Sequence, residues 1–450
     1  MNEVTARTVA HDILIRVETT DAFADVLLGN RLAGGSLGPE DARLCTQLVY
    51  GTLAWQGRLD HHLQALFKRP LARLEPPVLC ALRLGLYQLL FLERVPAYAA
   101  IDASVTLVRR HGPGVRGLVN ALLRKASAGP HTLALPPAAE RVRRLAVEWS
   151  HPEWLVERWA HAYEPEALVA LLRADNEPAP TTLRVNPRRA SRDDVIEELG
   201  RHGVIARPGA WTASAVVIER GGAGALGATA LAGGRVSFQS EASQLVVDLL
   251  APRSGMRVLD ACAAPGGKST AIAERLAGTG QVLALDPRRA GLGRLHAECD
   301  RLGLTGVSAA VADARFPPTH AVFDAVLVDA PCSGLGTLRR HPEARWRRRP
   351  EDVPRLAALQ RAILDQVSPL VRPGGVLVYA VCTLTSEESE DVIRDFVAAH
   401  PTFGVEPAQR VLPGSARELC DPDGFVRTLP SRHGLDGFFA ARLAREPALG

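Results

Sequence analysis

RVLDACAAPGGKST, residues 257–270, joins a short apolar run to a glycine-rich loop. The apolar residues before Asp260 predict a buried strand, and the two glycines before Lys268 predict a tight turn straight into a helix. A helix that begins at a strand end points free backbone N–H groups at a ligand bound there. The segment therefore predicts a ligand site at the carboxyl edge of a parallel sheet.

Strands and helices alternate from residue 257 onwards, which is the pattern of βαβ units. We expect strands at residues 257–260, 281–286, 307–312, 324–328 and 376–380. Helices are expected at residues 268–277, 289–302, 354–370 and 386–400. The predicted fold class of residues 236–445 is therefore an α/β domain with a Rossmann-like sheet.

The amino-terminal part of the chain reads as helices. Leucines recur there at spacings of three and four, which predicts an all-α bundle over residues 1–130. This segment carries fifteen basic and eleven acidic side chains, enough to account for the net charge of +4 of the whole chain. Contact with a nucleic acid is one interpretation, and a partner-binding or spacer module is the other. Residues 127–139, rich in proline and alanine, have the composition of a linker.

A small α+β domain is predicted over residues 141–235. We expect one long helix at residues 152–174 and strands at residues 181–185 and 215–218. A segment with six glycines, residues 221–234, closes this domain as a second flexible break.

Three aspartates stand where predicted strands end: Asp286, Asp313 and Asp329. Carboxylates repel a triphosphate but suit a ligand with ribose hydroxyls, an exocyclic amine and a positive centre, and S-adenosylmethionine has all three. Asp286 lies about 20 residues beyond the glycines, the spacing at which an acid meets ribose hydroxyls. A nucleotide phosphate is the competing ligand, because the tripeptide GKS at residues 267–269 imitates a P-loop. However, Cys262 stands where that motif needs its first glycine.

Two cysteines close two apolar runs, Cys332 after VLVDAP and Cys382 after VLVYAV. The carboxyl ends of parallel strands meet at one edge of a sheet, so both thiols would face one cleft. Thiol chemistry is the functional hypothesis, and a small buried apolar side chain is the alternative for each cysteine. The seven cysteines show no C-x-x-C spacing, and no metal site is predicted.

A basic run with one aromatic residue follows Cys332. Between residues 339 and 349, six arginines and one glutamate surround a tryptophan. Arginines bind phosphates and an aromatic ring stacks on a base, whereas the alternative is an ordinary solvated surface. We expect RNA contacts from Arg339, Arg340, Arg345, Trp346 and Arg347.

Together these residues resemble the RNA cytosine-C5 methyltransferases of the NOL1/NOP2/Sun family, and the match extends over residues 238–443. The resemblance implies a class I S-adenosylmethionine-dependent methyltransferase domain. It assigns cofactor binding to Cys262, Ala263, Ala264, Pro265, Gly266, Gly267 and Lys268 and to Asp286, Asp313 and Asp329.

The family pattern also implies roles for the two thiols. Cys382 matches the nucleophile that adds to C6 of cytosine so that C5 can accept a methyl group, and Cys332 matches the cysteine that assists product release. Asp329 is expected to hydrogen-bond the base. Two positions depart from the pattern: Val381 stands where the family usually has threonine, and Ser240 replaces the usual aspartate.

The helical bundle resembles NusB-type RNA-binding domains, and the combination resembles family members that modify small-subunit (16S) ribosomal RNA. We therefore predict methyl transfer to a cytosine in 16S rRNA, with tRNA or another RNA as the alternative substrate. A nucleotide hydrolase and a non-catalytic RNA-binding factor are the other function classes, and exchanged thiol roles are the alternative mechanism.

The chain begins without a basic leader and contains no long uncharged apolar run. The expected protein is a cytoplasmic monomer that binds RNA and neither a membrane nor a metal.

Overall fold

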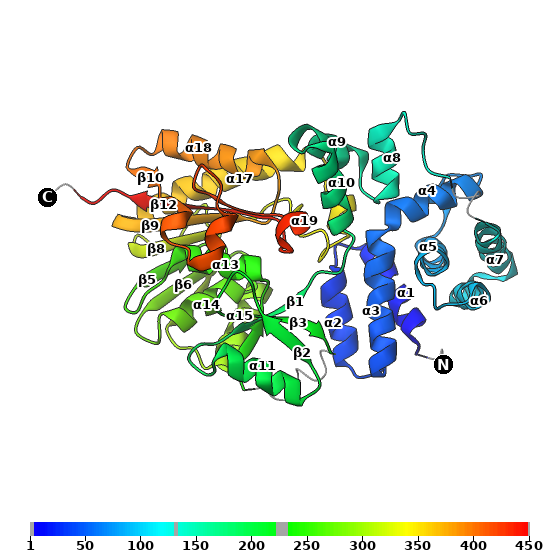
Figure 1. Cartoon of the computed structure of the whole chain (residues 1–450), viewed down its shortest axis with the longest axis horizontal. Coiled ribbons are helices and arrows are strands. Elements are labelled where there is room, and N and C mark those ends of the chain that lie inside the picture. Colours follow the sequence, from blue (N-terminus) through cyan, green and yellow to red (C-terminus); the bar gives the residue numbers. More distant parts are fainter. Residues whose placement is uncertain (1–3, 130–133, 222–232, 449–450) are drawn as a thin grey trace. The chain divides into compact units, whose positions relative to one another are not determined.

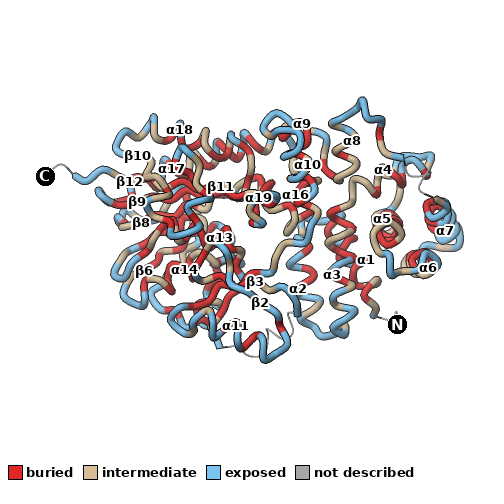
Figure 2. Tube along the Cα trace, in the orientation of Figure 1, coloured by how far each residue is buried: buried red, intermediate tan, exposed pale blue. Residues whose placement is uncertain are grey.

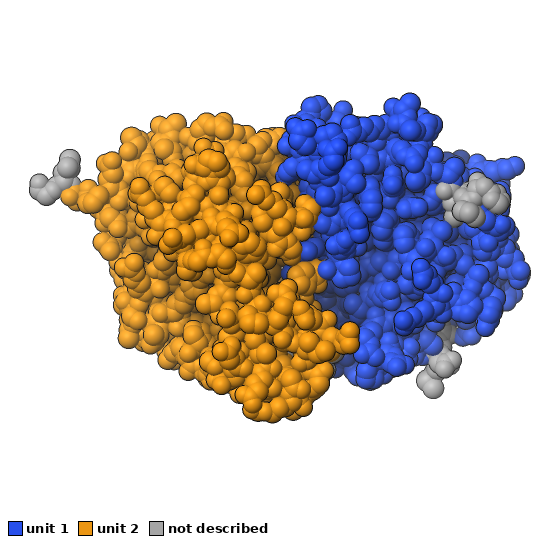
Figure 3. Space-filling view, viewed as in Figure 1, with its two compact units in different colours: residues 1–178, 338–350 blue, residues 179–337, 351–450 orange. Residues whose placement is uncertain are grey.

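The computed structural model describes residues 4–129, 134–221 and 233–448 (Figure 1). The chain divides into two compact units, each made of two stretches of sequence (Figure 3). The first unit holds residues 1–178 and 338–350, and the second holds residues 179–337 and 351–450. The segment Leu338–Pro350 thus belongs to the first unit, although the predicted methyltransferase domain flanks it in sequence.

The first unit is helical, as predicted for the amino-terminal bundle. Its α-helices are α1 (Ala6–Thr19), α2 (Ala24–Ala33), α3 (Pro39–Ala54), α4 (Gln56–Leu66), α5 (Pro76–Phe91), α6 (Ala97–Leu107), α7 (Pro113–Ser127), α8 (Arg141–Glu148), α9 (Glu153–Ala162), α10 (Pro165–Ala174) and α16 (Ala344–Arg347). Helix α5 is buried from Val78 to Gln88, as the colouring of Figure 2 also indicates, and it contacts α1, α3, α4, α6 and α7. A helix that is apolar all round is buried on every side, so α5 forms the centre of the bundle.

The prediction of a single helix over residues 152–174 is wrong. Helix α9 ends at Ala162, and α10 begins at Pro165. Proline has no N–H to donate and is tolerated in the first turn of a helix but not in its interior. The continuous apolar periodicity across the break concealed it.

The second unit is built on a large mixed sheet. Its strands are β5 (Arg257–Asp260), β6 (Gln281–Asp286), β7 (Val307–Val311), β8 (Phe323–Asp329), β9 (Val371–Val381), β10 (Phe403–Val405), β11 (Val426–Thr428) and β12 (Phe438–Arg445). The order is β10-β12-β9-β8-β5-β6-β7, with β11 paired to β12. Strands β5 to β9 pair in parallel, which confirms the predicted Rossmann-like sheet, whereas β12 runs antiparallel to β9 and was not predicted.

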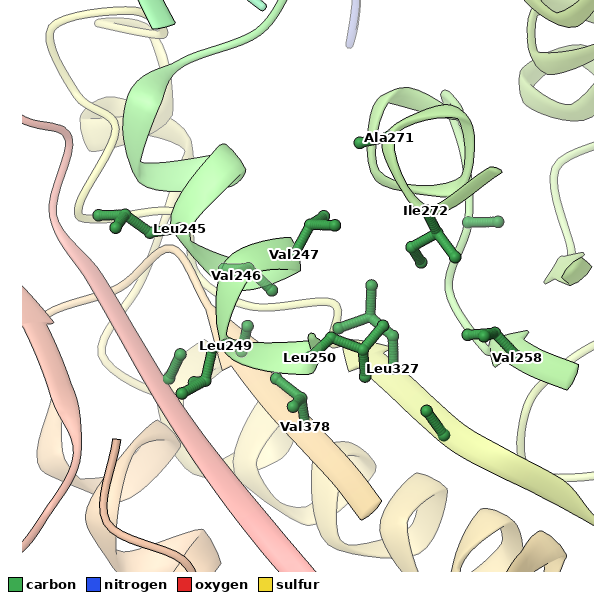
Figure 4. Packing of buried hydrophobic residues seen from close by; sticks show 14 of the residues in the cluster. Leu245, Val246, Val247, Leu249, Leu250, Val258, Ala271, Ile272, Leu327 and Val378 are labelled. Carbon is green, nitrogen blue, oxygen red and sulfur yellow. The ribbon is translucent and has the colours of Figure 1, made fainter. Parts of the chain in front are cut away.

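Helices cover both faces of this sheet (Figure 1). They are α13 (Glu241–Leu250), α14 (Gly267–Arg275) and α15 (Arg289–Leu302) on one face and α17 (Asp352–Val367) and α18 (Glu390–Ala399) on the other, with the short α19 (Pro430–His433) near the carboxyl terminus. Leu327 and Val378 pack with Leu250 of α13 (Figure 4). Val326 and Val328 belong to the core on the opposite face of the sheet. Two covered faces explain why these strands are continuously apolar.

A smaller antiparallel sheet precedes the large one in the second unit. Its strands are β1 (Thr181–Val185), β2 (Ile205–Pro208), β3 (Ala215–Arg220) and β4 (Val236–Phe238), in the order β2-β3-β1-β4, with α11 (Arg192–Arg201) between β1 and β2 in sequence. Helices α8, α9 and α10 belong to the first unit and this small sheet to the second, and the predicted domain of residues 141–235 stays a prediction. Residues 222–232 of the predicted glycine-rich segment lie outside the described residues.

The strand order reverses at the centre of the large sheet. From β5 the chain proceeds through β6 to β7 on one side, and it then returns to form β8 and β9 on the other. Asp260 of β5 is in register with Leu327 of β8, and Asp329 of β8 with Ala380 of β9. In open α/β sheets, ligands bind outside the carboxyl ends of the strands at such a switch point.

Candidate active site

A tight loop connects β5 to α14 at this switch point. Gly266 caps α14 with φ of 113°, a conformation that L side chains rarely adopt. A Cβ at this position would also lie 2.7 Å from Leu295 Cδ1, so only glycine fits. The next strand end holds the loop in place, because the Ala264 N–H donates to Asp286 Oδ2 at 3.0 Å.

Two predicted acids at the following strand ends are held ionised. Burial would raise the pKa of Asp286, but hydrogen bonds from Arg288 and from the Ala264 N–H outweigh it, so the pKa lies below its usual value. The pKa of Asp313 is lowered chiefly by hydrogen bonds from Arg315, whose Nη2 lies 2.7 Å from Oδ2. Both carboxylates are therefore charged acceptors at neutral pH.

The acidic strand ends converge around Cys262. Burial raises the pKa of this thiol well above its usual value, and the charges of Asp260, Asp329, Asp286 and Asp313 raise it further. Four carboxylates from different strand ends thus act on one sulfur atom. Cys262 is consequently a protonated thiol, consistent with a binding role and not a nucleophilic one.

Lys268 extends from the first turn of α14 to the end of β8. Its Nζ lies 2.6 Å from Asp329 Oδ2 and 5.6 Å from the centre of the Phe438 ring. Burial would lower the pKa of Lys268, but the Asp329 carboxylate raises it above the usual value, and Cys382 adds to that effect. The ammonium group thus binds Asp329 and also interacts electrostatically with Cys382, a predicted reactive thiol.

The two predicted thiols meet at the ends of β8 and β9. Cys332 Sγ lies 3.3 Å from Cys382 Sγ, and both side chains are partly exposed. The pKa of Cys332 is raised well above its usual value by the hydrogen bond with Cys382 and by burial. Cys332 and Cys382, which are fifty residues apart in the sequence, are therefore in direct contact.

The basic side chains of residues 339–349 do not form one exposed surface. Arg345 is fully buried in the first unit, where Nη1 donates to the carbonyl of Ser150 at 2.9 Å and to Asn176 Oδ1 at 2.8 Å. Burial lowers its pKa to about 10. The predicted RNA contact of Arg345 is corrected, because a side chain without exposed surface cannot reach a phosphate.

Two further members of the run also have structural contacts. Arg347 Nη2 donates to the carbonyls of Val17 at 2.8 Å and Ala22 at 2.9 Å. The Trp346 ring lies so close to Gly57 that a Cβ there would be 2.4 Å from it. Arg339 and Arg340 are partly exposed, and their predicted RNA contacts stay predictions.

Sequence reasoning missed Glu388, a fully buried acid that binds the loops carrying both thiols. It lies in the 3₁₀ turn η5 (Ser386–Glu388), inside the range where a helix was expected, whereas α18 begins only at Glu390. The adjacent acids Glu387 and Glu388 in this polar segment gave no signal that one of them is buried.

Three family models match successive parts of the chain. A family model described as 16S rRNA methyltransferase RsmB/F matches residues 247–444, a NusB family model matches residues 4–128, and a ferredoxin-like domain of RsmF/B-like methyltransferases matches residues 151–223. The ribosomal RNA small subunit methyltransferase B of Vibrio cholerae is 35% identical over 96% of this chain and 98% of its own length. The chain belongs to the ribosomal RNA small subunit methyltransferase B family.

A second relative and a solved structure agree with this family over the full length of the chain. A Bacillus subtilis protein described as a probable ribosomal RNA small subunit methyltransferase B is 37% identical over 99% of this chain and 100% of its own. The crystal structure of PH0851 covers 98% of this chain and 99% of its own, with a TM-score of 0.84 and 27% identity. Membership of this methyltransferase family confirms the predicted NusB-like and methyltransferase domains and disfavours the nucleotide hydrolase. Among the described helices, none has the length and apolarity needed to cross a membrane.

Proposed function

We propose that the protein transfers a methyl group from S-adenosylmethionine to C5 of a cytosine in small-subunit ribosomal RNA. The observation that carries this proposal is the contact of 3.3 Å between Cys332 Sγ and Cys382 Sγ at the switch point. Both thiols are partly exposed, and the Lys268–Asp329 ion pair joins the first turn of α14 to the end of the same strand β8. Two adjacent thiols at the strand ends that carry the predicted cofactor loop support covalent chemistry on a base.

The donor set of the loop fits S-adenosylmethionine. The ionised Asp286 and Asp313 are acceptors for ribose hydroxyls and an exocyclic amine, and the first turn of α14 offers backbone N–H groups. Residues 262–268 would surround the cofactor, which supplies an electrophilic methyl group when bound. The three aspartates around this loop also favour a ligand with a positive centre over a polyphosphate.

Cys382 acts as the nucleophile in the proposed reaction. C5 of cytosine is a poor nucleophile, so the Cys382 thiolate first adds to C6, and the electron pair of the C5–C6 double bond becomes available at C5. C5 would then form its bond to the methyl carbon of the donor as the bond between that carbon and the sulfonium sulfur breaks, with S-adenosylhomocysteine as the leaving group. Asp329, held by Lys268, is positioned for a hydrogen bond to the base near N3 and N4, which would stabilise the adduct.

Cys332 acts after methyl transfer. The C5 proton must leave to a base, and its electron pair restores the C5–C6 double bond as the bond between C6 and the Cys382 sulfur breaks. Cys382 bound as a thioether would no longer be the hydrogen-bond partner, or carry the charge, that raises the pKa of Cys332. Formation of the adduct therefore makes Cys332 easier to deprotonate when a base is needed.

Single thiol substitutions test these roles. We expect Cys382→Ala to abolish transfer of labelled methyl to small-subunit ribosomal RNA while the dissociation constant of S-adenosylmethionine is unchanged. Cys332→Ala should accumulate a covalent RNA–protein adduct that disappears in the double variant. Cys420→Ala is the control, because Cys420 is a free thiol elsewhere in the same unit.

Other outcomes of these assays would support the alternative mechanism, substrate or function class. Unchanged methyl transfer in Cys382→Ala would defeat the role of this residue, and an adduct that requires Cys332 would exchange the two roles. Parallel assays with tRNA separate the alternative substrate. RNA binding without methyl transfer by the wild-type protein would indicate a non-catalytic RNA-binding factor.

A further inference from the structure

One oxygen of a buried carboxylate holds the loop that carries Cys332. Glu388 Oε1 accepts hydrogen bonds from the main-chain N–H of Ser333 at 2.8 Å and from Gln360 Nε2 at 3.0 Å. Gln360 Nε2 also donates to the carbonyl of Pro331 at 2.9 Å. The residues on both sides of Cys332 are therefore fixed by Glu388 and Gln360, whose side chains have no exposed surface.

The other oxygen holds the loop that carries Cys382. Glu388 Oε2 accepts hydrogen bonds from the hydroxyls of Thr385 at 2.9 Å and Thr383 at 3.3 Å. Thr383 directly follows Cys382, and its hydroxyl lies 2.7 Å from that of Ser333 in the other loop. One carboxylate thus binds the residue next to each sulfur atom.

The burial of the Glu388 carboxylate calls for a specific explanation. Taking the charge out of water costs several kcal/mol, and apolar residues of similar volume often stabilise the same space at least as well. The four donors around Glu388 come from three separate parts of the chain: α17, the loop after β8 and the loop after β9. Their common acceptor is what fixes these parts relative to one another.

We infer that Glu388 is a positioning residue that holds the sulfur atoms of Cys332 and Cys382 in contact for methyl transfer. This inference rests on the proposed function, because contact between the thiols matters for catalysis only if both act on one base. The Glu388 charge also adds to the raised pKa of Cys332, after the hydrogen bond with Cys382, burial and the charge of Cys382. It therefore helps to keep Cys332 protonated while Cys382 attacks.

Oxidative crosslinking measures the thiol contact without any RNA. Diamide takes up the two thiol hydrogens as a disulfide forms, and mass spectrometry of the Cys332–Cys382 peptide pair gives the rate. Glu388→Ala should slow this crosslink about tenfold, because a 1 Å displacement of reacting groups already costs up to about 100-fold. Glu388→Gln should crosslink within about two-fold of the wild type, because its amide can donate to rotated threonine hydroxyls.

Asp324→Asn is the matched control at the other end of β8. Asp324 accepts hydrogen bonds from the Arg257 N–H at 2.7 Å and from Arg372 Nε at 2.6 Å, and it touches neither thiol loop. We expect wild-type crosslinking and activity for this variant. Equal crosslinking rates in Glu388→Ala and the wild type would overturn the inference.

Kinetics supply the second readout. Glu388→Ala should lower kcat about 100-fold with KM for S-adenosylmethionine within about two-fold, and Glu388→Gln should recover most of kcat. Gln360→Met removes the donors only on the Cys332 side, so it should accumulate the covalent RNA adduct. If Glu388→Ala does not fold, the Gln360→Met variant provides the test instead. In that case, wild-type rates of thiol crosslinking and of RNA release from the adduct in Gln360→Met would overturn the inference.

The experiments distinguish failure of the proposed function from failure of the positioning role of Glu388. Slow crosslinking in Glu388→Ala together with full methyl transfer by Cys382→Ala would keep the positioning role and defeat the proposed function. An inactive Cys382→Ala together with wild-type behaviour of Glu388→Ala would do the reverse.

Discussion

Lys268 Nζ lies 2.6 Å from Asp329 Oδ2, and this ion pair joins the first turn of α14 to the end of β8. The chain has only three lysines among its 53 basic residues, so a lysine at this position is unusual for the protein. An ammonium is a compact point charge, whereas a guanidinium is a larger planar fork. The Lys268 side chain is 12% exposed, so a guanidinium would have to displace its surroundings.

Replacing this lysine should impair catalysis even when positive charge is kept. We expect Lys268→Met and Lys268→Arg each to lower kcat/KM for methyl transfer about 100-fold, because the charge on Asp329 loses its preorganised partner. Transfer of tritiated methyl to RNA measures the effect, with Lys125→Met in α7 as the control. Full activity of Lys268→Arg would mean that any cation suffices.

The contact between the thiols predicts an unusual alkylation profile. The hydrogen bond with Cys382 is the largest cause of the raised pKa of Cys332. In Cys382→Ser, which keeps a similar volume, the midpoint of the iodoacetamide rate of Cys332 against pH should therefore move to lower pH. Peptide mass spectrometry reads the rate at each pH, with Cys420 as the internal reference. An unmoved midpoint would assign the raised pKa to burial alone.

The sequence predicted the parts of the fold that depend on local pattern. The strands at 257–260 and 281–286 and the helix at 289–302 begin and end where expected, because apolar runs and glycines mark them directly. Strand β12 was missed, because its sequence FFAARLAR mixes two arginines with apolar residues and its place between β9 and β10 depends on distant pairing. Local signals do not contain such long-range partners.

In the candidate site, too, features that depend on local sequence could be predicted, whereas features that depend on distant residues could not. The positions of the glycine-rich loop and of Cys382 at strand ends could be predicted, because an apolar strand directly precedes each of them in sequence. Arg345 was misassigned, because the atoms that bury it belong to residues at least 169 positions away. When the partners are this far away in the sequence, the local sequence around a buried arginine does not differ from that around an exposed one.

Arg345 should be a major source of stability of the first unit. Its guanidinium donates to the carbonyls of Ser150 and Asp175 and to Asn176 Oδ1. Arg345→Met removes one donor from each of these acceptors, at roughly 1–3 kcal/mol for each, so we expect a loss of about 3 kcal/mol or more in unfolding free energy. Urea denaturation of the full chain measures it. The exposed Arg110→Met is the control and should change stability by about 0.5 kcal/mol at most.

Asp260 should make stability depend on pH in a direction opposite to that of most carboxylates. Burial raises its pKa to about 6, against the lowering effect of the hydrogen bond from Ser269. Between about pH 4 and pH 6 the unfolded chain has lost this proton while the folded protein still holds it. Folding is therefore favoured by the Asp260 proton at low pH, and this contribution disappears as the pH rises through about 6.

The substitution Asp260→Asn removes this titration and keeps an acceptor for the Ser269 hydroxyl, which lies 2.6 Å from Asp260 Oδ2. A shift of about two pKa units corresponds to about 3 kcal/mol. The unfolding free energy of the variant relative to the wild type should thus rise by about 3 kcal/mol from pH 4 to pH 7. Urea titrations at several pH values measure both proteins, and common terms from other groups cancel in the difference. Parallel curves would mean that Asp260 is charged in the folded protein throughout this range.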